Sequence, residues 1–188
     1  MRFFIALEIP DISKEELEDI QQKLKQIIQE VRLTDPAKVH LTLAFVGNQE
    51  GSMKDSLVEV IKNAVKGISS FTVTPSYIDG FPSLHYPQVF WVGVKGDIDK
   101  LFVIRGKIKD GLVKLKLTID ERRFIPHIAI AKTKNDFKLN QFQEEALQKI
   151  MTDNFSPIQI SSIKLFESIP EHGFHTHNTL AEIKLNIR

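Results

Sequence analysis

The sequence contains no cysteine, and this absence excludes several kinds of chemistry at once. Among its 188 residues there is no thiol that could form a disulfide, act as a thiolate nucleophile or bind a metal. A chain without disulfides also fits a reducing compartment. We therefore expect a cytoplasmic protein whose chemistry depends on other side chains.

Long apolar runs and an excess of one charge are absent too. No segment approaches the roughly 18 consecutive apolar residues of a membrane span, and the apolar run at residues 3–7 is too short for a signal peptide. The 25 basic residues nearly balance the 24 acidic ones, which leaves a formal net charge of +1. Proteins that coat nucleic acid carry a broad basic surface, so any contact with nucleic acid must be local.

The length and composition are those of a globular protein. A chain of 188 residues forms one domain or two small lobes, and its 42% hydrophobic and 26% charged residues are typical of a soluble fold. Segments with strand and helix patterns alternate irregularly, without a low-complexity stretch or a linker. The pattern predicts an α+β fold.

Apolar periodicity locates the expected elements. Strands are expected at residues 3–9, 39–46, 71–78, 88–94, 124–131, 158–166 and 179–187, and helices at 13–31, 52–67, 98–112 and 140–151. Ser13 and Glu16 form a capping-box pattern for the first helix, and Ser52 is the expected N-cap of the second. The last strand is expected to pair with the preceding one through a loop at residues 167–177.

Residues 39–46 place a histidine and a hydroxyl on one face of a short strand. Side chains alternate across a strand, so Leu41, Leu43 and Phe45 are expected to face the core. His40 and Thr42 then lie together on the opposite face.

A similar pattern occurs in residues 124–131. Ile128 and Ile130 are expected to share the core face, and His127 and Ala129 the other. Two strands that each present a histidine beside a small side chain suggest a site built from two similar halves.

Two histidines on separate strands are suited to proton transfer, because the unperturbed pKa of imidazole lies near neutral pH. Displacement at phosphorus suits such a pair, since the attacking water must lose a proton and the leaving oxygen must gain one. The Thr42 hydroxyl could bond a phosphoryl oxygen, and no metal is required. The competing interpretation is that each histidine is a hydrogen-bonded structural residue of a half-buried strand.

The residues around both histidines, taken with the rest of the chain, resemble the RNA 2',3'-cyclic phosphodiesterases of the two-histidine phosphoesterase superfamily, historically called 2'-5' RNA ligases. The resemblance rests on residues 1–7, 40–47, 80–82, 89–93, 124–130 and 165–185. It implies a bilobal α+β fold with pseudo-two-fold symmetry, in which two antiparallel sheets flank a central cleft and helices lie outside. Residues 1–188 would form a single domain of two interleaved lobes.

The resemblance also implies an activity, the metal-independent opening of a 2',3'-cyclic phosphate to a 2'-phosphate. His40 would protonate the departing 3'-oxygen, His127 would activate water, and Thr42 would hold a phosphoryl oxygen. The partners would be RNA ends or nucleotides that carry the cyclic phosphate, with neither a cofactor nor a membrane, and the protein would be a monomer. The same site could run the reverse 2'-5' ligation weakly.

The chain departs from the family at three site positions. Ala129 replaces a threonine of the second motif, and the loss of a donor to a charged phosphoryl oxygen would cost about 1.5 to 3 kcal/mol. Lys132 stands where the family often has arginine, and His177 where it has a tyrosine near the end of the chain. Two alternatives therefore stay open: a binding protein for RNA ends or nucleotides with impaired catalysis, and a phosphodiesterase for small cyclic nucleotides or 2'-5'-linked oligonucleotides.

Two other side chains are candidates for substrate binding, in addition to Lys132 and His177. Arg123 is expected by parity to share the face of His127 and to meet a phosphate, unless it is a solvated strand end. Phe81 could stack on a base, although it could equally pack in the core.

The histidines near the C-terminus raise the question of zinc. His172, His175 and His177 are spaced as metal ligands can be, but no carboxylate or cysteine pattern completes a site around them. The sequence therefore predicts no metal site.

Overall fold

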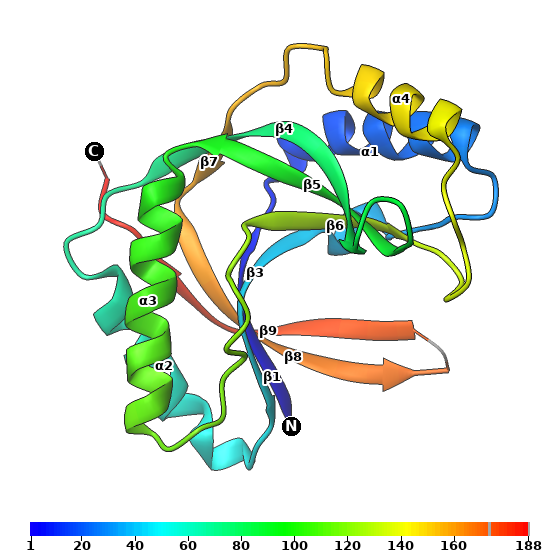
Figure 1. The fold of residues 1–188 in the computed structure, drawn as a ribbon. Coiled ribbons are helices and arrows are strands. Elements are labelled where there is room, and N and C mark those ends of the chain that lie inside the picture. The colour runs from blue at the N-terminus through cyan, green and yellow to red at the C-terminus, as the bar shows by residue number, and fades with distance from the viewer. Residues whose placement is uncertain (173, 188) are drawn as a thin grey trace.

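The computed structural model describes residues 1–172 and 174–187, and in this part of the chain nine strands form one strongly curved sheet (Figure 1). The strands are β1 (Arg2–Glu8), β2 (Arg32–Leu33), β3 (His40–Asn48), β4 (Phe71–Pro82), β5 (Pro87–Gly96), β6 (His127–Lys132), β7 (Ile158–Ile160), β8 (Ser162–Glu171) and β9 (Phe174–Lys184). The helices are α1 (Asp11–Ile27), α2 (Lys54–Val65), α3 (Ile98–Lys114) and α4 (Gln141–Ile150), with 3-10 turns at Pro36–Lys38 and Gly51–Met53. The prediction of an α+β fold is confirmed.

The sheet consists of two halves that meet between β3 and β6. The strand order is β7-β4-β5-β6-β3-β1-β8-β9, with β2 paired to β6, and these strands pair antiparallel. In the described residues a single pair, Leu41 with Ile128, joins β3 to β6. The structure thus has one continuous sheet where the resemblance implies two, and the narrow junction lies beside both motif histidines.

The order of elements repeats along the chain. The series β1-α1-β3-α2-β4 is followed by β5-α3-β6-α4-β8, and β4 pairs with β5 while β8 pairs with β1. Each half of the sheet therefore takes strands from both parts of the chain. This mixing of strands from both parts of the chain is what two interleaved lobes would require. The lobes themselves and their pseudo-two-fold symmetry stay predictions.

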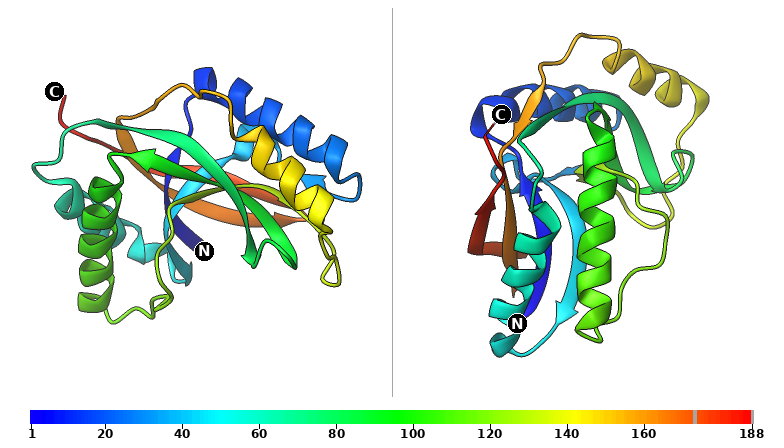
Figure 2. Two further views of the ribbon diagram at one scale, coloured as in Figure 1. Left: turned by 45° about the horizontal axis from the view of Figure 1, so that its top comes forward. Right: turned by 90° about the vertical axis from the view of Figure 1, so that its left-hand side faces the viewer.

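The helices lie in two pairs on the outside of the curved sheet. Figures 1 and 2 show α1 beside α4, and α2 beside α3. Each helix buries one side, as α1 does with Leu17, Ile20 and Leu24, whose spacing of three to four residues places them on one face. No helix in residues 1–172 and 174–187 has the length and apolarity needed to cross a bilayer.

Gln21 is the polar side chain that the described core contains. Its Nε2 donates hydrogen bonds to the carbonyl oxygens of Thr34 (2.7 Å) and Ile130 (2.8 Å). A buried amide is tolerated when it is bonded in this way. The contact ties α1 to β6, the strand that begins with His127.

The predicted starts of the first two helices are wrong. α1 begins at Asp11 without a side-chain cap, and Glu16 instead accepts hydrogen bonds from the Ser156 backbone N–H (2.9 Å) and hydroxyl (2.8 Å). α2 begins at Lys54, after a 3-10 turn that contains Ser52. A capping pattern is a local signal, whereas here the Glu16 carboxylate accepts its hydrogen bonds from Ser156, a residue distant in sequence.

The C-terminal hairpin is longer than the sequence predicts. Of the stretch 167–177 that was expected as a loop, residues 167–171 belong to β8 and residues 174–177 to β9, and the two strands pair as far as Glu171 with Phe174. Figure 1 shows this hairpin extending away from the other strands. Because most side chains of this stretch are exposed or half-buried, the alternation that normally reveals a strand is weak.

Candidate functional site

The junction of β3 and β6 brings His40 and His127 to one cavity. Each is the first residue of its strand, and the pairing of Leu41 with Ile128 sets the two strands side by side. The cavity has a volume of about 690 Å³, and both histidines line it. The structure therefore unites the two motifs, which are far apart in the sequence.

Each imidazole is held in the same way by its own chain. Nδ1 of His40 donates to the carbonyl oxygen of Lys38 (2.8 Å), and Nδ1 of His127 donates to that of Ile125 (2.7 Å). A carbonyl oxygen can only accept, so the neutral form of each ring carries its proton on Nδ1. Nε2 of each ring then has a free lone pair for chemistry.

Burial lowers the pKa of both imidazoles below the ordinary value. For His40 the hydrogen bond to Lys38 opposes this effect, and the charge of His127 adds to it. For His127 the bond to Ile125 opposes burial. Because the two rings interact electrostatically, protonation of one disfavours protonation of the other, as suits an acid and a base that work as a pair.

Aromatic rings pack against each histidine and limit its movement. The ring centroid of His40 lies 5.2 Å from that of Phe4. The centroid of His127 lies 5.0 Å from Phe81 and 5.5 Å from Trp91. Phe81 thus lines the cavity and also supports His127.

His177, on β9, is a third imidazole in the cavity. Its centroid lies 5.3 Å from His40 and 4.9 Å from Phe4. Burial, followed by the positive charges of His40, Lys38 and His175, lowers the pKa of His177 to about 4. The ring is therefore neutral near pH 7 and can donate or accept one hydrogen bond.

The cavity concentrates positive charge. Of its described lining residues, four are cationic and one is acidic: Arg2, Arg32, Lys38, Lys132 and Asp35. The whole chain has a formal net charge of only +1. A local cluster of this kind attracts an anion to one place on the protein. It agrees with the expectation that any contact with nucleic acid is local.

Seven of the eight predicted site residues line this cavity, namely His40, Thr42, Phe81, His127, Ala129, Lys132 and His177. Arg123 does not. It is exposed and lies near Tyr77, whose pKa its charge influences. β6 begins at His127, so the alternation assumed from Arg123 to His127 does not extend through the segment before the strand.

Phe45 is a cavity residue that the sequence analysis missed. It was expected in the core, but β3 shifts register against β1 on either side of it, so that Ala44 is buried and Phe45 lines the cavity with 60% of its surface exposed. Such β-bulges redirect side chains near functional sites. A regular alternation of apolar residues contains no signal for them.

The histidines near the C-terminus contact protein groups of the cavity. Nδ1 of His175 shares a hydrogen bond with the hydroxyl of Ser168 (3.0 Å), and His177 packs against His40. Both His175 and His177 line the cavity with the motif residues. Among residues 1–172 and 174–187 no group of three potential ligands is arranged to hold a metal ion.

Comparison with known proteins gives consistent matches. The family model described as LigT like Phosphoesterase matches residues 7–91. The RNA 2',3'-cyclic phosphodiesterase of Methanocaldococcus jannaschii is 28% identical over 171 residues, which cover 89% of this chain and 91% of the relative. The protein of the same name from Thermotoga maritima is 26% identical over 162 residues, which cover 86% of this chain and 82% of the relative.

Solved structures share the fold. A protein of Thermus thermophilus has a TM-score of 0.79 at 16% identity, covering 100% of this chain and 99% of that one. Escherichia coli LigT in complex with 3'-AMP has a TM-score of 0.75 at 17% identity, covering 98% of each chain.

The protein is thus a hydrolase that acts on phosphodiester bonds. Within that class, residues 7–91 match the LigT-like phosphoesterase family model, and most of the chain is similar to relatives named RNA 2',3'-cyclic phosphodiesterase. The resemblance noted in the sequence is confirmed.

The low pKa of His177 makes a prediction about stability in acid. An unfolded histidine binds a proton near pH 6.5, whereas folded His177 does so only near pH 4. The free energy of unfolding should therefore fall as the pH drops from about 6.5 to about 4, and His177→Gln should make this fall shallower. Urea denaturation at a series of pH values measures the effect. Asn178→Gln, on the exposed neighbouring residue, is the control, and equal pH dependence in all three proteins would contradict the assignment.

Proposed function

We propose that this protein is an RNA 2',3'-cyclic phosphodiesterase that converts a 2',3'-cyclic phosphate to a 2'-phosphate by general acid and base catalysis. The observation that carries the proposal is the matched arrangement of His40 and His127, each with Nδ1 bonded to a backbone carbonyl and Nε2 free, in one cationic cavity. Relatives that bear this name support the substrate class. The 3'-AMP bound to the similarly folded LigT supports a nucleotide as ligand.

His40 serves as the general acid and His127 as the general base. Nε2 of His127 takes a proton from water as the new P–O bond forms, and Nε2–H of His40 gives a proton to the 3'-oxygen as its bond to phosphorus breaks. The 2'-oxygen keeps the phosphate. An anionic substrate raises the pKa of His40 while it is bound, which opposes the effect of burial. The two nitrogens handle both protons, so the scheme requires no metal.

Thr42 and nearby cations hold the phosphoryl oxygens. Thr42 lines the cavity two residues after His40. On the other side, Arg32 of β2 lies opposite Lys132 of β6 in the sheet register, and both line the same cavity as Ala129. Charge-assisted hydrogen bonds from such cations are strong, so they can replace part of what the missing threonine would contribute.

The exposed ring of Phe45 provides a surface for the base of the substrate. It lies on the strand of His40, where the sugar with the departing 3'-oxygen must be. Bases of single-stranded RNA commonly stack on such rings. Phe81 and His177 complete the contacts from β4 and β9. The proposal includes a cytoplasmic, monomeric enzyme, as the sequence leads us to expect.

Ala129 supports a second candidate function, a binding protein for RNA ends or nucleotides with impaired catalysis. Its methyl group lines the cavity at the position of the expected donor and can make no hydrogen bond to a phosphoryl oxygen. Both candidates predict that the protein binds the nucleotide, but only the enzyme would also turn it over.

The proposed mechanism predicts that either histidine alone is insufficient. His40→Ala and His127→Ala should each reduce hydrolysis of a 2',3'-cyclic nucleotide by roughly 10²- to 10⁴-fold, because each removes a general acid or base. The assay is run with EDTA present, and Phe142→Ala, an exposed residue on α4, is the control. Binding of the cyclic nucleotide without turnover in the wild type would favour the second candidate, and a reaction abolished by EDTA would contradict the mechanism.

Restoring the threonine predicts a gain of activity. Ala129→Thr should raise kcat/KM for the cyclic nucleotide by about tenfold to a hundredfold, since a donor to a charged oxygen contributes about 1.5 to 3 kcal/mol. Ala129→Val, which has the same shape without the hydroxyl, is the matched control. An equal rate in the threonine variant and the wild type would mean that Arg32 and Lys132 already fill the role.

A further inference from the structure

A second aromatic surface lies beside the cavity, on the side of His127. Tyr77 of β4 and His127 of β6 both pair with Gly93 of β5, so the three residues form a row across three strands. Strands are spaced about 4.8 Å apart, which puts the backbones of Tyr77 and His127 about 10 Å apart. The ring of Trp91 connects them, with its centroid 5.5 Å from each.

Gly93 allows the Tyr77 ring to lie against the sheet. A Cβ at position 93 would come within 2.2 to 2.8 Å of three ring atoms of Tyr77, so another side chain there would displace the ring. One side of the ring thus packs on Gly93, yet Tyr77 is 39% exposed. The exposed part of the ring can contact a ligand.

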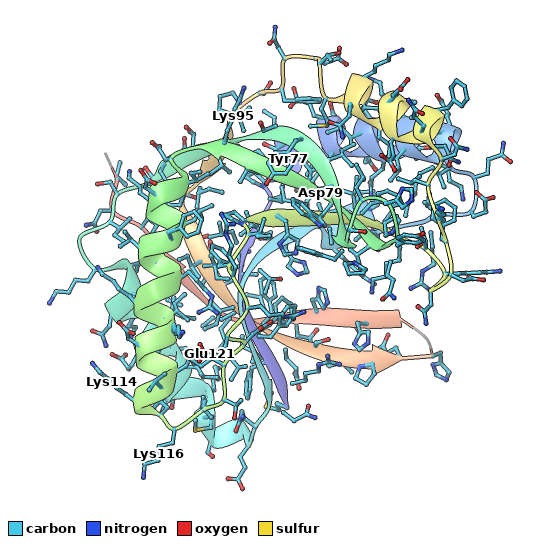
Figure 3. The ribbon with its side chains drawn as sticks, viewed as in Figure 1. Tyr77, Asp79, Lys95, Lys114, Lys116 and Glu121 are labelled. Carbon is cyan, nitrogen blue, oxygen red and sulfur yellow. The ribbon has the colours of Figure 1, made fainter. Side chains whose placement is uncertain are left out.

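Charges of both signs act on the hydroxyl of this ring. Burial raises the pKa of the Tyr77 hydroxyl, the charge of Asp79 raises it further, and that of Arg123 lowers it. Figure 3 shows Tyr77 and Asp79 near one another along the β4–β5 ribbon. An exposed aromatic ring can stack a base of a single-stranded nucleic acid, and the exposed Arg123, whose charge acts on the Tyr77 hydroxyl, can meet a phosphate.

The corresponding place on the other side of the site is built differently. His40 lies opposite Glu8 of β1 in the sheet, whereas His127 lies opposite Gly93 of β5. The carboxylate of Glu8 is paired with Lys164 of β8. The His40 side thus has an ion pair where the His127 side has a glycine covered by an aromatic ring.

We propose that Tyr77 is the stacking platform for a second nucleobase, so that the site holds one nucleoside on each side of the reacting phosphate. The ligand class is a dinucleoside monophosphate, or two adjoining nucleosides of an oligonucleotide, whose second nucleoside takes the place of the attacking water on the His127 side; a 2',3'-cyclic mononucleotide occupies the His40 side alone. One base stacks near Phe45 on the His40 side, and the other stacks on Tyr77 beyond His127. The inference rests on the proposed function, which puts the phosphate between the two histidines.

The test compares two phosphodiesters of equal charge. One is the deoxydinucleoside monophosphate of adenosine, which has no vicinal hydroxyl and cannot be cleaved through a cyclic phosphate. The other is deoxyadenosine 3'-methylphosphate, in which a methyl group replaces the second nucleoside. Binding is measured by calorimetry and by the fluorescence of Trp91, the one tryptophan of the sequence, which contacts Tyr77. The wild type should bind the dinucleoside roughly fivefold to a hundredfold more tightly, as stacking of one base on an aromatic ring implies.

Variants of the platform should remove this preference. Tyr77→Leu should bind both ligands equally, whereas Tyr77→Phe should keep most of the preference. Gly93→Ala should also reduce it, because the new methyl group displaces the ring. Tyr86→Leu is the matched control, since Tyr86 is the other tyrosine of the chain and lies outside the row from Tyr77 through Gly93 to His127.

Two results would overturn the inference: equal affinity of the wild type for the two ligands, or an unchanged preference in Tyr77→Leu. Hydrolysis of a 2',3'-cyclic nucleotide by the wild type separately tests the proposed function. Turnover without a dinucleoside preference would refute the platform alone. A preference without turnover would refute the phosphodiesterase and leave the platform standing.

Discussion

A hydrogen bond from an imidazole to a carbonyl oxygen of its own chain is the interaction on which the site depends. It occurs twice, from His40 to Lys38 and from His127 to Ile125, and in both cases the acceptor lies two residues before the histidine. Each histidine begins a strand, so the carbonyl two residues before it lies outside that strand. It is therefore not one of the acceptors that the strand's own hydrogen-bond ladder uses. The bond sets the tautomer and the ring orientation together, as orienting partners of functional histidines do.

The rest of the fold serves to bring these two units together. The single pair of Leu41 with Ile128 joins the halves of the sheet and sets the strand starts side by side. Gln21 anchors β6 from α1, and aromatic rings pack on each histidine. In the proposed mechanism, burial lowers the pKa of the imidazoles although one of them has to give a proton. A substrate anion bound among the four cationic side chains would offset this effect, since negative charge beside His40 favours its protonated form.

Local alternation was enough to predict the centre of the site and much of the fold. It placed His40 with Thr42 and His127 with Ala129, and all four line the cavity. The helix expected at residues 98–112 is α3. These features depend on contacts between near neighbours in sequence.

The features that were missed depend on contacts between distant segments. The register shifts of β3 against β1 turn Phe45 into the cavity, and no alternation signals them. The pairing of β8 with β9 places His177 against His40, although residues 167–177 contain little apolar periodicity. The row from Tyr77 through Gly93 to His127 exists only once three strands are in register. Arg123 precedes β6, so it joins Tyr77 instead of the cavity lining.

The tautomers of the two histidines test the account most directly. Nitrogen-15 NMR of the protein with labelled histidine, at a pH above 8 where the rings are neutral, distinguishes a protonated Nδ1 from a protonated Nε2. The account predicts that both His40 and His127 carry the proton on Nδ1, and that phosphate added to the sample shifts the resonance of Nε2 in both. A proton on Nε2 of either neutral ring would contradict the account, because Nδ1 of that ring would then have no proton to donate to the backbone carbonyl.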